Sequence, residues 1–229
     1  MPFYFGTADG KFEDRREQLG FKRVTQPMGV NIGDIDNDGF LDCYIGTGYV
    51  DYEGLIPNVM FHNVEGKRLD DVTFSAKVGH LQKGHGVSLA DFDEDGDLDI
   101  FAVMGGWFSG DAFARVVFEN KGTDNRWLFI RLVGVESDRY GLGCRVKAQY
   151  TDSAGTKHIL YRTMDAGGSF GDNPFRIHLG LRDANQVDEL EVTWPTTGKT
   201  QQFKNVGVGR FIEITEGNAE IRELNYGQK

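Results

Sequence analysis

The sequence predicts an all-β fold in which two propeller-blade-like repeats precede a β-sandwich-like domain. Glycine accounts for 31 of the 229 residues, about twice its usual share of roughly 7%, which is typical of chains with many tight turns. Short apolar runs that carry Val and Phe lie between the turn signals, and helical periodicity is weak. Part of the first half also recurs at a fixed spacing. Regularly spaced short strands of this kind indicate a propeller blade or an equivalent β-sheet repeat.

The repeat has a period of 57 residues. The segment GVNIGDIDNDGFLDCYIGTG at 29–48 aligns with GVSLADFDEDGDLDIFAVMG at 86–105, and 86 − 29 = 57. A shorter Phe-x-Asn match, at 61–63 and 118–120, has the same period. We therefore assign residues 1–122 to about two units with roughly four short strands each.

The strands of this first part can be placed from their apolar runs. We expect them at residues 41–45, 59–62, 98–104 and 114–119. Only residues 12–19 and 70–78 are expected to hold a turn or two of helix.

The sequence changes character at residues 123–125, after which the acidic segment of the repeats does not recur. Alternation of apolar and polar residues predicts strands at 127–133, 145–150, 158–162, 175–181, 187–194 and 209–215. Residues 123–217 are thus expected to form a compact β domain, and the polar residues 218–229 are expected to fray.

Composition excludes some function classes. The chain holds 25 Lys and Arg against 35 Asp and Glu, a net charge of −10, so it repels phosphate backbones and is not expected to bind nucleic acid. It has no apolar run of 18 residues that could span a membrane. Cys43 and Cys144 both lie in apolar stretches, which favours two core thiols and leaves a single bridge between them open.

The strongest chemical signal is the motif D-x-D-x-D-G-x-x-D, which occurs once in each repeat. Its carboxylates at positions 1, 3, 5 and 9 are Asp34, Asp36, Asp38 and Asp42, and then Asp91, Asp93, Asp95 and Asp99. Alternate residues of a tight loop can all point inward, and Ca²⁺ takes about six to eight oxygen ligands. Position 7 is expected to add only a backbone carbonyl, from Phe40 and Asp97. Position 4, Asn37 and Glu94, is expected to face water.

Two bound Ca²⁺ ions are the interpretation that we favour for these loops. Two carboxylates ~4 Å apart repel by about 4 kcal/mol at an effective dielectric of 20, so four of them in nine residues call for a cation. The alternatives are an acidic solvated turn and Mg²⁺, which resists all-protein cages. The loop is not an EF-hand, because position 12 carries Ile45 or Ala102 in place of a bidentate Glu.

The histidines give no catalytic assignment. His80 and His85 form either a transition-metal or ligand site or, as we favour, part of a polar loop. His178 is expected to be a packed or solvent-facing strand residue. Neither a His-x-x-x-His nor a His-Glu-x-x-His pair is present. The segment GGSFG at 167–171 superficially resembles a nucleophile elbow, but the strand-to-helix context is missing, so we favour Ser169 as a turn residue.

Three aromatic residues follow the last strand of the second repeat: Trp107, Phe108 and Phe113. They form either a contact patch for a partner or a sugar or, as we favour, the core of the blade.

Further segments carry a family resemblance. They are GLGCRV at 141–146, GGSF at 167–170, NPFRIHLGL at 173–181 and VDELEVTWP at 187–195. With these, residues 125–216 resemble the ASPIC/UnbV domain of a cartilage acidic protein-like bacterial family. Residues 1–120, with their acidic loops, resemble the FG-GAP or VCBS-type repeats that precede this domain and are related to the calcium-binding blades of integrin α-subunits. The resemblance implies that the eight loop aspartates bind Ca²⁺, and it implies a secreted adhesion or interaction protein.

One departure from the family concerns the number of repeats. Closure of a propeller takes about four blades or more, so two units leave sheet edges unprotected. We expect the chain's own C-terminal domain, a protein partner or a second copy of the chain to cover them.

These expectations combine into one functional hypothesis. The chain is expected to be a non-enzymatic calcium-binding module for adhesion, or a subunit of an extracytoplasmic or membrane-associated complex, with carbohydrate as a further candidate ligand. The alternative is a hydrolase-like enzyme with its cleft between the repeats and the C-terminal domain. Millimolar extracellular calcium would fill even weak sites, so we expect a periplasmic or extracellular location, although residues 1–6 do not resemble a signal peptide.

Overall fold

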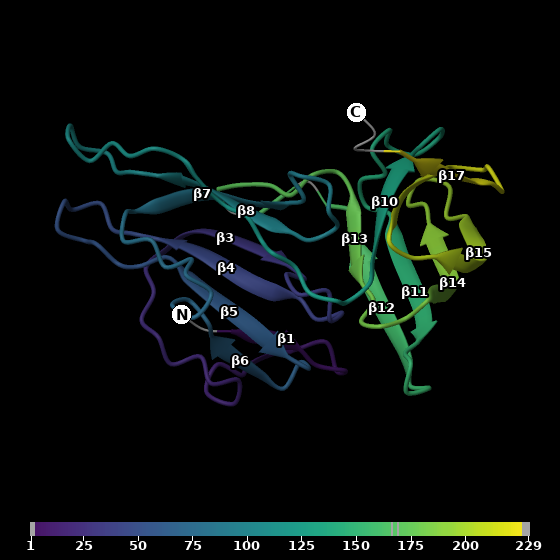
Figure 1. The fold of residues 1–229 in the computed structure, drawn as a ribbon, viewed down its shortest axis with the longest axis horizontal. Helices are drawn as coiled ribbons and strands as arrows, with labels where there is room; N and C mark the ends of the chain where they lie inside the picture. The colour runs from purple at the N-terminus through teal and green to yellow at the C-terminus, as the bar shows by residue number, and fades with distance from the viewer. Residues whose placement is uncertain (1–2, 166, 169, 226–229) are drawn as a thin grey trace.

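The computed structural model describes residues 3–165, 167–168 and 170–225. In these residues the strands form five sheets, without any helix, so the predicted all-β fold class is confirmed. Figure 1 shows small blade-like sheets from the first part of the chain on one side and a pair of sheets from the second part on the other. No described segment forms a helix that is long and apolar enough to cross a membrane.

The first repeat forms an antiparallel sheet in the order β3-β4-β5-β6. These strands are β3 (Pro27–Gly33), β4 (Asp42–Thr47), β5 (Val59–Val64) and β6 (Arg68–Asp71). The inner strand β4 is buried at every residue. A hairpin of β1 (Tyr4–Gly6) and β2 (Phe12–Asp14) precedes the sheet, and Phe5 packs with Phe21 and Phe61 in its buried cluster.

The second repeat forms a smaller sheet of β7 (Gly84–Ala90), β8 (Asp99–Met104) and β9 (Val116–Phe118). Strand β7 packs against β3 and β4, and the side-chain amide of Asn31 donates to the carbonyl of Val87 at 3.0 Å. The sheet has three strands where four were expected. From β9 the chain continues directly into the C-terminal domain.

The C-terminal domain is a β-sandwich of two four-stranded sheets, ordered β13-β10-β16-β17 and β12-β11-β14-β15. The strands are β10 (Trp127–Val133), β11 (Arg145–Thr151), β12 (Lys157–Thr163), β13 (Ile177–Gly180), β14 (Gln186–Thr193), β15 (Thr200–Gly207), β16 (Arg210–Thr215) and β17 (Ile221–Leu224). Residues of both sheets, including the fully buried Trp194 and Leu179, share one core. The pairing of β10 with β16 is parallel, whereas the other pairs of this domain are antiparallel.

Several sequence expectations need correction. Six strands were not placed from the sequence: β1, β2, β3, β6, β7 and β15. In addition, β17 pairs with β16 inside the segment that was expected to fray. Residues 12–19 hold all of β2 and residues 70–78 hold the end of β6, each followed by isolated turns, and neither segment holds a helix. Cys43 and Cys144 are free buried thiols in different cores, so there is no bridge between them. Ser169, of the GGSF segment, lies outside the described residues.

The two halves of the chain share a third core. Phe129 of β10 and Phe211 of β16 pack in one buried cluster with blade residues such as Tyr44, Leu89 and Ile100. The C-terminal domain thereby covers one apolar face of the blades, as one version of the sequence expectation proposed.

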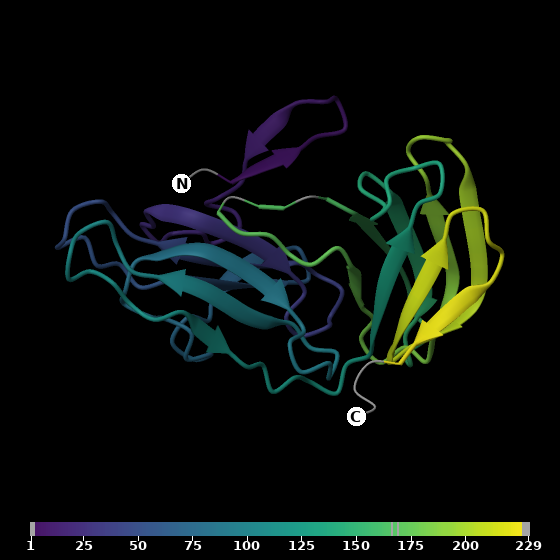
Figure 2. The ribbon, with the colours of Figure 1, turned by 90° about the horizontal axis from the view of Figure 1, so that it is seen from above.

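Between β12 and β13, the described residues 164–165, 167–168 and 170–176 extend from the C-terminal domain along the blades (Figure 2). The amide of Val87 donates to the carbonyl of Phe170 at 2.9 Å. Gly171 has a φ of +147°, and a Cβ there would lie 1.9 Å from the carbonyl oxygen of Val87. This close approach therefore requires glycine. We refer to this segment as the β12–β13 loop.

Candidate metal centre

Both acidic loops lie at the junction between the blades and the C-terminal domain. The first loop joins β3 to β4 and the second joins β7 to β8. A Cβ at Gly180 of β13 would lie 2.1 Å from Oδ2 of Asp34, so the C-terminal sheet directly contacts the first loop. Within the second loop, a Cβ at Gly96 would lie 1.8 Å from the ring of Trp127 of β10.

Backbone amides hold the aspartates of the first loop in place. The amides of Asp38 and Gly39 donate to the two carboxylate oxygens of Asp34 at 3.0 and 2.8 Å. The amide of Ile35 donates to Oδ2 of Asp42 at 2.9 Å, which closes the nine-residue loop. The left-handed φ of Gly39, +92°, allows the turn between them.

Three carboxylates of the first loop converge. One oxygen from each of Asp34, Asp36 and Asp42 lies within 4.8 Å of the others, and Asp34 and Asp42 are each only 1% exposed. Burial raises the pKa of Asp34 to about 8, although Nη2 of Arg162, 3.8 Å from Oδ2, acts in the opposite direction. Burial also raises the pKa of Asp42 to about 7. Such carboxylates stay ionised only if a cation compensates them, so the donor set fits a hard divalent metal.

The second loop repeats this arrangement in a more open setting. Oxygens of Asp91, Asp93 and Asp99 lie within 4.8 Å of one another. The amide of Gly96 donates to Asp91 at 3.0 Å, and that of Phe92 donates to Asp99 at 3.0 Å. Burial raises the pKa of Asp91 to about 6. The weaker burial predicts a weaker metal site than in the first loop.

The remaining predicted ligands occupy related but different places. Asp38 has a carboxylate oxygen near Asp36 and His62, and Asp95 belongs to none of the groups found among the described residues. At position 7, the amide of Phe40 donates to Asp38 at 2.8 Å and that of Asp97 donates to Asp95 at 3.0 Å. Their carbonyls as ligands stay a prediction.

Position 4 of the first loop differs from the sequence expectation. Asn37 is fully buried and does not face water, because its Nδ2 donates to Oδ1 of Asp97 at 2.7 Å and so joins the two loops. The carbonyl of Asn37 also accepts from the amide of Arg182 in the C-terminal domain at 2.9 Å. Its counterpart Glu94 is partly exposed.

Sequence reasoning missed the asparagines that support position 9. The amide of Asn63 donates to Asp42 at 2.7 Å, and the amide of Asn120 donates to Asp99 at 2.8 Å. Their side chains donate to the carbonyls of Leu41 and Leu98, which precede those aspartates. The recurring Phe-x-Asn match was the signal, although sequence alone did not indicate its role.

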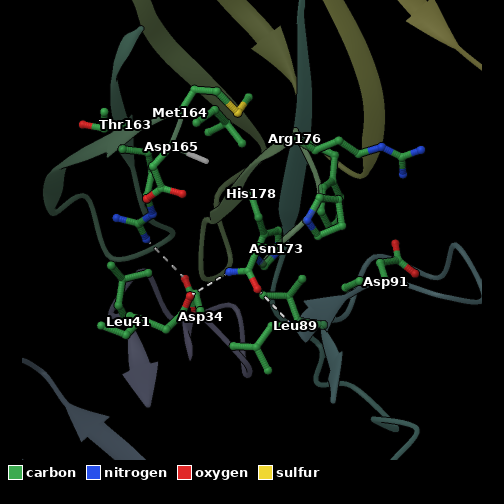
Figure 3. Close-up of a pocket in the computed structure, with 18 of the residues that line it drawn as sticks. Asp34, Leu41, Leu89, Asp91, Thr163, Met164, Asp165, Asn173, Arg176 and His178 are labelled. Carbon is green, nitrogen blue, oxygen red and sulfur yellow. Dashed lines mark hydrogen bonds and ion pairs between the residues drawn. The ribbon is translucent and has the colours of Figure 1, made fainter. Parts of the chain in front are cut away.

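A cavity of about 310 Å³ lies between the loops and the C-terminal domain (Figure 3). Asp34, Asp91, Arg162 and His178 are among its lining residues. The ring of His178 stacks on Phe129 with centroids 4.5 Å apart. Burial, together with Arg162, lowers the pKa of His178 to about 3, so its ring is neutral. Neither of its nitrogens has a hydrogen-bond partner among the described residues.

His80 and His85 were the other candidates for a transition-metal or ligand site. Nδ1 of His80 accepts from the amide of Gln82, and Nε2 of His85 contacts the carbonyl of Gly105, so these histidines do not converge on a metal.

The three aromatic residues after the second repeat were expected in the blade core, but this expectation is wrong. Trp107 is 88% exposed, and the exposed fractions of Phe108 and Phe113 are 45% and 46%. Trp107 and Phe113 line a second cavity, of about 520 Å³, together with Tyr49.

Comparisons with known proteins match the C-terminal domain. A family model described as ASPIC and UnbV matches residues 134–221. Cartilage acidic protein 1 of Mus musculus is 36% identical over 95 residues, which cover 41% of this chain and 14% of that protein. Cartilage acidic protein 1 of Xenopus tropicalis is 35% identical over 91 residues, which cover 39% of this chain and 13% of that protein. The C-terminal domain is therefore similar to the ASPIC and UnbV family and to a short segment of cartilage acidic protein 1, whereas the likeness of residues 1–120 to FG-GAP or VCBS-type repeats stays a prediction.

Proposed function

We propose that this chain is a non-enzymatic interaction or assembly module whose two acidic loops bind Ca²⁺. The observation that carries the proposal is the pair of buried carboxylates, Asp34 and Asp42, which converge with Asp36 at the junction of the two halves. An ion at this place would neutralise them and fix the loop against the C-terminal domain. Its role would be structural.

The donor chemistry favours Ca²⁺ over Mg²⁺. The predicted ligands are carboxylate and carbonyl oxygens of the loop, which suit the longer and more variable bonds of Ca²⁺. Mg²⁺ demands octahedral geometry and keeps several waters, so a cage built mainly from protein carboxylates suits it less well.

The interaction role rests on the exposed parts of the blades. Two blades do not close a propeller, and the short β9 forms an edge of the second sheet. A protein partner or a second copy of this chain would cover such an edge. The exposed Trp107 and its aromatic neighbours keep carbohydrate as a candidate ligand. We infer a role in adhesion or in an extracytoplasmic or membrane-associated complex. In such a location outside the cytosol, both loops would be exposed to millimolar calcium.

The alternative is a hydrolase-like enzyme that uses the cavity between the halves. Such an enzyme would need a His-acid or Ser-His pair at the cavity. His178 lines it and forms no hydrogen bond with an acid among the described residues. Turnover of ester or glycoside substrates that is lost in His178→Ala would favour the enzyme instead.

Thermal melting with calcium, with magnesium and with a chelator tests the proposal. If free Ca²⁺ is about 100-fold above the dissociation constant, each site adds about 2.7 kcal/mol to stability. We expect a calcium-specific rise of the melting temperature that Asp36→Ala and Asp93→Ala each reduce. Glu136→Ala is the control, because Glu136 follows β10 and pairs at the surface with Lys199, in the turn between β14 and β15 of the C-terminal domain. A melting temperature that does not respond to chelation would refute the calcium sites.

A further inference from the structure

We propose that the first acidic loop also binds a divalent transition metal of the zinc class, through Asp36, Asp38 and His62. This inference rests on the proposed metal binding of that loop and goes beyond it, because it adds a nitrogen ligand and a second class of metal. The second loop has no such ligand set among the described residues.

The fold brings His62 to the loop from another strand. His62 lies on β5, which pairs with β4 in the register that sets Cys43 opposite Phe61. Strand β4, which starts at the end of the first acidic loop, therefore lies beside β5, which carries His62. One ligand atom from each of Asp36, Asp38 and His62 lies within 4.8 Å of the others.

The imidazole nitrogen of His62 is placed as a ligand atom beside the loop. Nε2 of His62 and Oδ2 of Asp36 form an ion-pair contact of 3.0 Å, in which Nε2 is shielded from solvent and lacks hydrogen-bond geometry. A ring nitrogen 3.0 Å from a carboxylate oxygen has the spacing of two ligands on one ion. The His62 side chain as a whole is 32% exposed, so an ion can reach the site from solution.

The ligand types determine the class of metal. Calcium prefers oxygen ligands, whereas an imidazole nitrogen suits zinc, cobalt and related first-row metals. Two carboxylates and one imidazole make a three-ligand site with a position left for water. Asp36 also belongs to the carboxylate group with Asp34 and Asp42, so its two oxygens can serve both ions.

The repeat provides a matched comparison inside the same chain. Glu119 is the counterpart of His62, because 119 − 62 equals the period of 57. Its carboxylate pairs with Lys121 and is 57% exposed, and it belongs to none of the metal-ligand groups found in the described part of the chain. The first loop should therefore differ from the second in metal preference.

Titration with Co²⁺ and Zn²⁺ in saturating calcium tests this inference. Co²⁺ bound through a nitrogen ligand has a characteristic visible absorption, and Zn²⁺ should displace it. We expect His62→Gln to lose the Co²⁺ signal and to weaken Zn²⁺ binding by at least about tenfold, which is the smaller end of what even outer-shell partners contribute. Glu119→Gln should leave both unchanged.

The outcomes separate this inference from the proposed function. If His62→Gln binds Co²⁺ and Zn²⁺ like the unaltered protein, or if the unaltered protein binds neither, His62 only pairs with Asp36 and the inference is overturned. The calcium-dependent rise in melting temperature is measured on the same samples. A rise without Co²⁺ binding refutes only the transition-metal site, whereas the lack of a rise refutes the calcium sites.

Discussion

At the scale of single residues, position 4 of each loop shows how one side chain can join two repeats. Asn37 and Glu94 both have left-handed backbones, with φ of 60° and 65°. Asparagine tolerates this conformation better than glutamate does. Only Asn37 also uses its side chain, by donating to Asp97 of the other loop.

Replacement of both residues by glycine isolates that hydrogen bond, because glycine accepts the same φ. Asn37→Gly should lower stability by about 1.5–3 kcal/mol, the range for a hydrogen bond to a charged group. Glu94→Gly should raise stability by up to about 1 kcal/mol through relief of strain. Chemical denaturation of both variants measures the difference. Equal effects of the two substitutions would show that Asn37 does not join the loops.

The buried Asp34 predicts an unusual pH dependence. Its pKa in the folded protein is about 8, above its ordinary value of 3.8, so without metal the folded state binds a proton more tightly than the unfolded state. That contribution is complete below about pH 4 and is lost as the pH rises towards about 8. With a chelator present, the melting temperature should therefore fall over this range. Calcium should reverse the trend, because it binds the deprotonated carboxylates.

Calorimetry over this pH range, with and without calcium, checks the prediction. Asp34→Asn is the control: an amide cannot titrate, so the metal-free slope should become shallower, and the part that remains comes from Asp42 and Asp91, whose pKa values burial also raises. A metal-free melting temperature that rises with pH would contradict the argument.

At the scale of elements, the β12–β13 loop links the first strands of both blade sheets, β3 and β7, through Asn173. Its Nδ2 donates to the carbonyl of Ile32 at 3.1 Å on β3. Its Oδ1 accepts from the amide of Leu89 at 2.9 Å on β7. One side chain of the C-terminal domain thus holds two blades at a fixed spacing.

Asn173→Ala removes both hydrogen bonds and should cost about 1–2 kcal/mol. The amide of Leu89 should then exchange with solvent faster. The amides of β11 and β14, which pair inside the C-terminal domain, serve as the internal control. Unchanged exchange at Leu89 would show that the loop is not needed to hold β7.

Local sequence predicted the strands where apolar residues alternate or cluster, and β10 has the predicted bounds, 127–133. It missed β15, because only Phe203 and Val206 of that strand are buried. It missed β17 because that strand is short and mainly exposed. Strands of this kind form through pairing with a neighbour, and a single sequence does not contain that information.

The candidate site was predictable to a similar extent. The motif spacing brought Asp34, Asp36 and Asp42 together, because a nine-residue loop is a local structure. The supporting Asn63 was not assigned, because it lies 21 residues after Asp42 and approaches only through the pairing of β4 with β5. The burial of Asn37 depends on the contact between two blades, which no local pattern encodes.

At the scale of the whole molecule, the loops and the shared core determine how firmly the two halves are joined. Phe129 and Phe211 enter the blade core from the C-terminal domain. Thr123 and Asn125 both donate side-chain hydrogen bonds to the carbonyl of Asp36 at 2.8 Å. An ion in the first loop would therefore order the contacts on which the junction depends.

Calorimetry should detect this coupling. With excess calcium we expect one unfolding transition for the whole chain, and in chelator two transitions, the blades melting first. The double variant Asp36→Ala and Asp93→Ala should show two transitions even with calcium. A single transition that is unaffected by chelation would contradict the coupling.

The parallel pairing of β10 with β16 has a consequence for biosynthesis. Leu128 pairs with Arg210, 82 residues further along the chain, so this sheet is incomplete until β16 has left the ribosome. Phe211 of the same strand also fills the core under the blades. The blades are translated first, so their apolar face stays exposed to solvent until β16 is synthesised. During that interval the nascent chain is most prone to aggregate and to bind a chaperone.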